Sequence, residues 1–419
     1  MDFAPSPAAL ALQARLGDFM ERLVLPSNRD WHRWADEGAY PSDVVEPIKA
    51  QARAAGLWNL FLPELRDDEP GTRLSNLEYA PLAEIMGRLP WAAEVFNCSA
   101  PDSGNMELLH RFATPAQAGR WLRPLLEGTL RSCYAMSEPD VASSDPTNLQ
   151  TSFRRDGNAW VLNGRKWFVT GALHPLCRLA LVMGVSDPDA EPHRRHSIAL
   201  VPMDTPGLSI VRNVPLLQHR AVEGHVELLL RDVRVPADHL LGEPGAGFAM
   251  AQARLGPGRV HHCMRTIGQC ELALELMCER ALERSAFGRR LSDFANVQDW
   301  IAESRVEIDQ ARLLVLAAAW RMDVQGNAAA AVDVAAIKLV AARLQTRVLD
   351  RAMQVFGAMG LSPDTPLAYL WTWGRAMRVL DGPDEVHLRS VARAELRRAR
   401  ERRGSNAAHF VPPAPLAPR

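Results

Sequence analysis

Three successive stretches with different hydrophobic patterns are the feature of this 419-residue sequence that most restricts its fold. Residues 1–130 show helical spacing, residues 131–245 show short strand-like runs, and residues 246–403 return to long helical stripes. A doubly wound or TIM-barrel enzyme would alternate strands and helices throughout, so this order excludes both folds. The sequence therefore predicts an α+β protein with an N-terminal helical domain, a central antiparallel β domain and a C-terminal helical bundle. No GxGxxG or GxxxxGK[ST] nucleotide loop is present.

Helical spacing is clearest at residues 74–86 and after residue 256. In the first segment, Ser75 or Asn76 can cap the helix, and Gly87 lies near its end. In the second, an apolar stripe from Val260 to Ala281 predicts the first long helix of a bundle. Two further bundle helices are expected at 297–322 and 330–356.

Turn pairs and β-rich runs mark the central region. Asp156-Gly157 predicts one turn, and Asn163-Gly164 predicts a second reversal before Trp167. Further strands are expected at 179–185, 198–202, 208–214 and 226–230. The tail, residues 404–419, contains four prolines, and we expect it to be mobile.

Charge and cysteine usage exclude several classes of function. The net charge is −1, so long-range attraction to nucleic acid or to an anionic membrane is not expected. None of the six cysteines forms a CxxC pair, so we predict no metal site and a reducing, cytoplasmic location. The longest apolar run, Leu313 to Trp320, is far shorter than the ~20 residues of a membrane span. We also expect no secretory signal.

Two motifs in the central region carry the first chemical information. Tyr134-Ala135-Met136-Ser137-Glu138-Pro139, followed by Ser143-Ser144-Asp145, closely resembles the acyl-CoA dehydrogenase signature. The resemblance implies that Tyr134, Met136, Ser137 and Ser144 lie along a flavin. The segment 163–171 resembles the family's hairpin, which implies that Phe168 packs on the flavin and that the Thr170 hydroxyl lies near N5. Taken alone, these motifs are also typical of a Ser-rich turn and a half-buried hairpin.

Two motifs in the bundle resemble elements that reach the FAD of a neighbouring subunit. The segment 284–291 is similar to the family's R-x-x-F-G element, which implies that Arg284 and Phe287 contact a partner's FAD. The segment 354–360 resembles the QxxGGxG element, which implies that Gln354, Gly357 and Ala358 approach its adenylate end. Taken alone, the two segments would pass for a basic turn and a helix end. Ala286 and Ala295 depart from the family pattern at two possible FAD contacts.

The segment 380–387 resembles the family's catalytic stretch. The resemblance makes Asp381 the catalytic base and places Pro383 and Glu385 at the flavin. Many members have glutamate at the base position, and aspartate is one methylene shorter, so loop or substrate must lie closer. Arg259, 25 positions before Arg284, matches the family's active-site arginine, which orients the base and favours its anionic form. Without the resemblance, these residues would be an acidic turn and a surface arginine.

The motifs occur in family order, so the sequence is identified as a member of the acyl-CoA dehydrogenases. It looks closest to the branch in which some members are fused to a kinase-like domain, and we expect no such domain here. The resemblance implies FAD-dependent α,β-desaturation of an acyl-CoA, with an electron-transfer flavoprotein as acceptor and a homodimer or homotetramer with FAD at the interface. Long-chain, branched or 4-substituted acyl groups, including 4-phosphorylated ones, fit this branch. Two alternatives stay open: a nitroalkane oxidase-like flavin oxidase and a flavin-poor, non-catalytic binding protein.

Overall fold

Helices, a sheet and a second set of helices follow one another in the computed structural model, which describes residues 3–410. The helices of the first part are α1 (Pro7–Phe19), α2 (Asn28–Asp36), α3 (Ser42–Ala54), α4 (Asn76–Gly87), α5 (Ala92–Val95), α6 (Asp102–Phe112), α7 (Pro115–Gln117) and α8 (Arg123–Glu127). Ser75 caps α4 in a reciprocal capping box with Glu78, which satisfies two free N–H groups of the first turn. The predicted helix at 74–86 is therefore confirmed.

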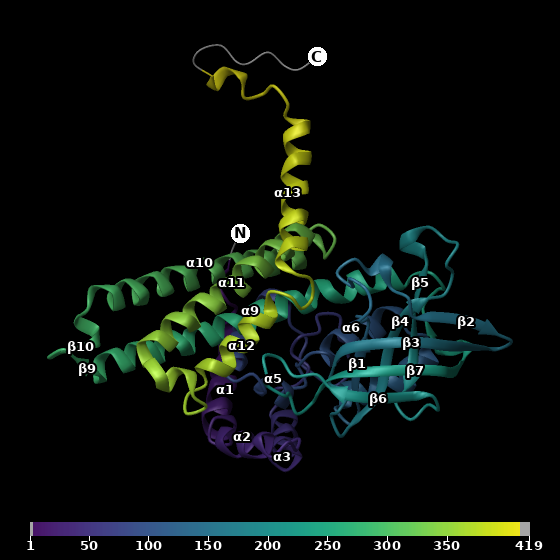
Figure 1. The fold of residues 1–419 in the computed structure, drawn as a ribbon, viewed down its shortest axis with the longest axis horizontal. Helices are drawn as coiled ribbons and strands as arrows, with labels where there is room; N and C mark the ends of the chain where they lie inside the picture. Colours follow the sequence, from purple (N-terminus) through teal and green to yellow (C-terminus); the bar gives the residue numbers. More distant parts are fainter. Residues whose placement is uncertain (1–2, 411–419) are drawn as a thin grey trace.

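The central part is an eight-stranded sheet at one end of the molecule (Figure 1). Its strands are β1 (Arg131–Ala135), β2 (Ser152–Asp156), β3 (Ala159–Thr170), β4 (Cys177–Val185), β5 (His196–Pro202), β6 (Leu208–Asn213), β7 (His225–Pro236) and β8 (Leu240–Leu241). The order is β6-β7-β3-β2-β4-β5-β8, with β1 beside β4. Most neighbours are antiparallel, whereas β1 and β2 run parallel to β4.

The predicted chain reversal at Asn163-Gly164 is wrong. β3 continues through these residues beside β7, with a register shift between Leu162 and Gly164. A Cβ on Gly164 would lie 2.4 Å from the Thr151 hydroxyl oxygen, so glycine permits a close approach here. The other predicted turn, at Asp156-Gly157, is confirmed, because β2 and β3 form a hairpin there with Asp156 opposite Ala159.

The second set of helices forms the bundle and carries a short hairpin at the end far from the large sheet (Figure 1). Its elements are α9 (Gly247–Glu283), β9 (Ser285–Ala286), β10 (Arg289–Arg290), α10 (Ala295–Gln325), α11 (Ala331–Phe356), α12 (Leu367–Met377) and α13 (Asp384–Glu401). The helices predicted at 297–322 and 330–356 are confirmed. The first helix, α9, begins at Gly247, earlier than the predicted start after residue 256. Pro257 lies inside this helix, and the turns before Pro257 bury Met250 and Ala251.

Helix α9 packs against the first set of helices and against the sheet, as well as against the other bundle helices, so it brings all three parts of the chain together. α9 contacts α4 and α6 of the first part, β5 of the sheet, and α10 and α11 of the bundle. Among residues 3–410, no helix is sufficiently long and apolar to span a membrane. The tail that we expect to be mobile lies, from residue 411 onward, outside the described residues.

Candidate active site

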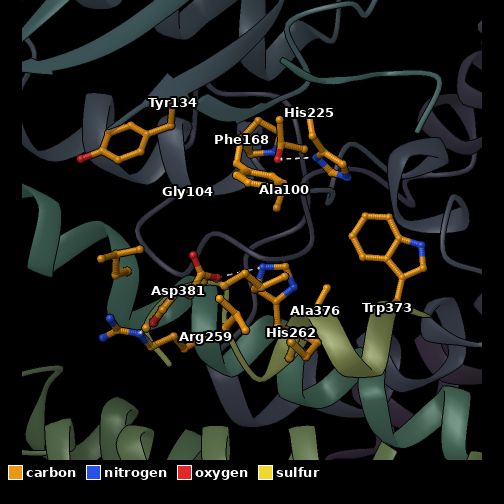
Figure 2. Close-up of a pocket in the computed structure, with 18 of the residues that line it drawn as sticks. Ala100, Gly104, Tyr134, Phe168, His225, Arg259, His262, Trp373, Ala376 and Asp381 are labelled. Carbon is orange, nitrogen blue, oxygen red and sulfur yellow. Dashed lines mark hydrogen bonds and ion pairs between the residues drawn. The ribbon is translucent and has the colours of Figure 1, made fainter. Parts of the chain in front are cut away.

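A cavity of about 1170 Å³ lies where the sheet meets the helices. Its walls include the segment after β1, the end of β3, the middle of α9 and the turn between α12 and α13. Figure 2 shows Phe168 and His225 on one side and Asp381, Arg259 and His262 on the other. The volume is slightly above the range typical of small-molecule sites, which is about 300–1,000 Å³.

The turn that carries Asp381 has an unusual backbone that other side chains hold in place. Asp381 has φ +52°, in the left-handed region, which aspartate tolerates better than most residues. The next residue, Gly382, has φ +103°, a conformation that residues with a side chain rarely adopt, so glycine is favoured there. Arg259 Nε donates to the main-chain oxygen of Asp381 at 2.8 Å, and buried Lys338 donates to the Met377 carbonyl. Arg259 of α9 therefore holds the Asp381 backbone directly, and Lys338 of α11 holds the end of α12 that leads into the turn.

The carboxylate of Asp381 faces the cavity and is ionised. Its side chain is 24% exposed, and His262 Nε2 lies 3.2 Å from Oδ2. Burial alone would raise the pKa of Asp381, but the hydrogen bond from His262 and the charges of Arg254 and Lys338 hold it well below its usual value. The sequence singled out Arg259 for this electrostatic role. In the structure the Arg259 guanidinium donates to the main-chain oxygen of Asp381, and its charge also interacts with that residue, as do those of Arg254 and Lys338.

The opposite wall presents an aromatic ring and a hydroxyl group. Phe168 has φ +49° and is 39% exposed, with its ring in the cavity (Figure 2). Thr170 Oγ1 lies 3.0 Å from Nδ1 of buried His225. Burial lowers the pKa of His225 to about 4, so its ring is neutral at physiological pH. The sequence did not indicate His225, because it lies on another strand, 55 positions from Thr170.

A buried ion pair holds the segment after β1 against β3. Lys166 Nζ donates at 2.8 Å both to the Met136 carbonyl and to the Glu138 carboxylate. The Trp167 N–H donates to the Ser137 carbonyl at 3.0 Å. Burial lowers the pKa of Lys166 to about 8, although Glu138 opposes this shift. These contacts fix the segment that the sequence predicts to lie along the flavin.

The groups on the cavity wall fit a flavin. An isoalloxazine ring needs an apolar slot with a few convergent hydrogen-bonding groups. Phe168 supplies apolar surface, and the hydroxyls of Ser137 and Ser144 have no hydrogen-bond partner among the described residues. The buried Tyr134 hydroxyl and His225 Nε2 also lack partners there. All five side chains line the same cavity, so they can hold a ring with polar edges.

The structure brings together one part of the predicted site and leaves another part outside the cavity. The predicted residues that line the cavity are Tyr134, Met136, Ser137, Ser144, Phe168, Thr170, Arg259, Asp381 and Pro383. The predicted residues that do not line it are Arg284, Phe287, Gln354, Gly357, Ala358 and Glu385. Phe287, in the hairpin between β9 and β10, is 98% exposed, and Glu385 is exposed in the first turn of α13. None of these six residues therefore contributes to the wall of the cavity in its own chain.

Two residues of the site had a partial signal in the sequence. His262 follows Arg259 by three positions, so both lie on one face of a helix. Lys166 lies next to Trp167 in the second motif. In neither case does the sequence show which carboxylate the side chain meets, because Asp381 is 119 and Glu138 is 28 positions away.

Comparison with known proteins finds similarity to acyl-CoA dehydrogenases over nearly the whole chain. Family models for the N-terminal, middle and C-terminal domains of acyl-CoA dehydrogenases match residues 6–129, 133–233 and 245–396. A Mycobacterium tuberculosis protein named "Probable acyl-CoA dehydrogenase FadE2" is 53% identical, covering 95% of this chain and 98% of that protein. Mouse acyl-CoA dehydrogenase family member 10 is 50% identical over 94% of this chain, which spans only 37% of the mouse protein.

Solved structures show the same architecture. A Mycobacterium abscessus structure has 48% identity and a TM-score of 0.91, covering 94% of this chain and 99% of that chain. Butyryl-CoA dehydrogenase of Megasphaera elsdenii has 25% identity and a TM-score of 0.80, covering 94% of this chain and 100% of that chain. The α+β fold predicted from the sequence is confirmed.

Proposed function

The chain belongs to the acyl-CoA dehydrogenase family, and we propose that it uses FAD to desaturate an acyl-CoA thioester between Cα and Cβ. The observation that carries this proposal is the ionised carboxylate of Asp381, which faces the Phe168–Thr170 wall across the cavity. The reaction needs a base on one side of the substrate and a bound flavin on the other. The carboxylate can serve as the base, and the opposite wall fits a flavin.

Proton abstraction depends on Asp381 and its backbone. The carboxylate takes the Cα proton, and the pair of electrons left behind forms the new double bond as hydride leaves Cβ. Bound FAD supplies the hydride acceptor. The thioester oxygen gains negative charge as the proton leaves, and fixed donors stabilise such charge. The main-chain N–H of Asp381 donates to no group among residues 3–410, so it is free to serve the thioester oxygen.

We further propose that the protein works as a homodimer or homotetramer and passes electrons to an electron-transfer flavoprotein. Arg284, Phe287, Gln354, Gly357 and Ala358 would then contact the FAD of a neighbouring subunit. The nearly complete exposure of the Phe287 ring supports a subunit contact at this end of the bundle. Six free cysteines, five of them buried, support a reducing compartment such as the cytoplasm.

An anaerobic titration tests the proposed function. The purified protein is expected to show a flavin spectrum, and one or more acyl-CoAs from a panel of chain lengths and 4-substituents should bleach it. The reduced protein should pass electrons to an electron-transfer flavoprotein and react slowly with oxygen. Rapid reoxidation by oxygen would instead identify a flavin oxidase. A colourless protein that FAD does not reconstitute would identify a non-catalytic binding protein.

A further inference from the structure

His262 is the side chain that contacts the carboxylate of Asp381 inside the cavity. Its Nε2 lies 3.2 Å from Asp381 Oδ2, and its Nδ1 lies 3.2 Å from Arg265 Nη2. Both partners are at hydrogen-bond distance or close to it. Arg265 is itself buried and donates through Nη1 to the Cys98 carbonyl at 3.4 Å. Arg265, His262 and Asp381 thus form a connected series of contacts, which begins at the buried Cys98 carbonyl and ends at the Asp381 carboxylate in the cavity.

The chemistry of Arg265 determines which nitrogen of His262 carries the proton. A guanidinium has only donors and is always charged, so Nδ1 must accept its hydrogen bond. Burial lowers the pKa of His262, so the ring is neutral and carries one proton. That proton is therefore on Nε2, where it can be donated to the carboxylate of Asp381.

We propose that His262 is a positioning residue, which aims the Asp381 carboxylate at the substrate, with Arg265 fixing the required tautomer of the ring. This inference rests on the proposed function, because it takes Asp381 to be the base. A neutral donor suits this role, since it orients the carboxylate and opposes proton uptake less than a charged donor would.

The adjacent histidine has a different environment and supplies a matched control. His261 is buried, and neither of its ring nitrogens has a partner among the described residues. It packs edge-on against Tyr79 and Phe61, with ring centroids 5.0 and 6.0 Å away. One helix thus carries a histidine in the core beside a histidine bonded to the base.

Other charged groups lie close to Asp381 and His262. They come from three elements: Arg254, Arg259 and Arg265 of α9, Lys338 of α11, and Asp384 and His387 of α13. All of them remain in a His262 variant, so a change in the rate of that variant reports on the loss of the His262 contact.

The test compares His262→Ala, His262→Gln and His261→Leu with wild type. Anaerobic flavin reduction by a reactive acyl-CoA is measured from about pH 5 to about pH 8. Wild type and His262→Ala should both show no acid limb from Asp381 in this range, because the charges of Arg254 and Lys338 oppose the effect of burial in both proteins. Reduction at pH 8 should be about tenfold slower in His262→Ala, because the carboxylate is no longer aimed.

The other variants separate positioning from simple loss of packing. His262→Gln retains an N–H donor and should recover part of the rate. His261→Leu should keep the wild-type rate. A wild-type rate in His262→Ala, or an equal loss of rate in His261→Leu, would overturn the proposal.

A second readout needs no substrate. Nitrogen NMR of ¹⁵N-histidine-labelled holoprotein should show a neutral ring protonated on Nε2, whose signal disappears in His262→Gln and shifts in Asp381→Asn. A ring protonated on Nδ1, or an imidazolium at neutral pH, would overturn the proposal. If no acyl-CoA reduces wild type while the NMR result holds, the proposed function fails and the His262–Asp381 geometry stands.

Discussion

Replacing Asp381 with asparagine should remove the base and leave the site otherwise intact. Asparagine also tolerates the left-handed backbone that residue 381 adopts, at φ +52°. Arg259 binds the main-chain oxygen, so its hydrogen bond remains. The amide oxygen can still accept from His262, although a bond to a neutral acceptor is about half as strong. The free energy of unfolding should therefore fall by only about 1 kcal/mol.

The effect on the reaction should be far larger. General-base catalysis contributes about 10²- to 10⁴-fold, which corresponds to about 2.7–5.4 kcal/mol in the barrier. Stopped-flow bleaching of the flavin by an acyl-CoA, without oxygen, measures this directly, and visible absorbance measures FAD content. Glu395→Gln, which removes an exposed carboxylate on α13, is the control. Full FAD content with a rate within about threefold of wild type would refute the role of Asp381.

Three further predictions concern stability and assembly. Lys166→Met should lower the free energy of unfolding by about 3–5 kcal/mol, because it leaves the buried Glu138 carboxylate unpaired; adding Glu138→Gln should recover part of this in urea unfolding, and a loss below about 1 kcal/mol would contradict it. Burial raises the pKa of Glu107 to about 8, so wild-type stability should be full below about pH 4.5 and fall as pH rises towards 8. Glu107→Gln should flatten this dependence and stabilise the protein by about 2 kcal/mol at pH 7. An equal free energy of unfolding of wild type at pH 5 and pH 8 would count against this prediction. Phe287→Ala should give smaller particles in sedimentation and less bound flavin with unchanged circular dichroism, whereas an unchanged assembly would remove the hairpin from the interface.

The sequence was sufficient for the order of the three parts and for much of the cavity lining. Helix signals such as the Ser75 cap act locally, so they can be read without knowing the fold. Gly164 could not be interpreted in this way, because Asn-Gly is typical of a turn while glycine also permits close contact within a strand. The domain boundaries after residues 130, 245 and 403 stay proposals.

Contacts between side chains that are far apart in the chain could not be predicted from the sequence. Helical periodicity places Arg259 and His262 on one face but does not show that this face meets the 381 turn. A buried lysine such as Lys166 is rare, and nothing near it in the sequence shows that the residue is buried. Contacts of Arg284 or Gln354 with a second subunit depend on a surface that one chain does not contain.

The hydrogen bond from Arg259 ends on the peptide oxygen of residue 381 and not on the carboxylate. In the proposed mechanism the side chain is neutralised each time it accepts a proton, but the peptide oxygen stays an equally good acceptor. The anchor is therefore insensitive to the charge cycle of the residue it holds. The turn can keep one shape through repeated protonation and release, whereas an anchor on the carboxylate would loosen at the moment when alignment matters most.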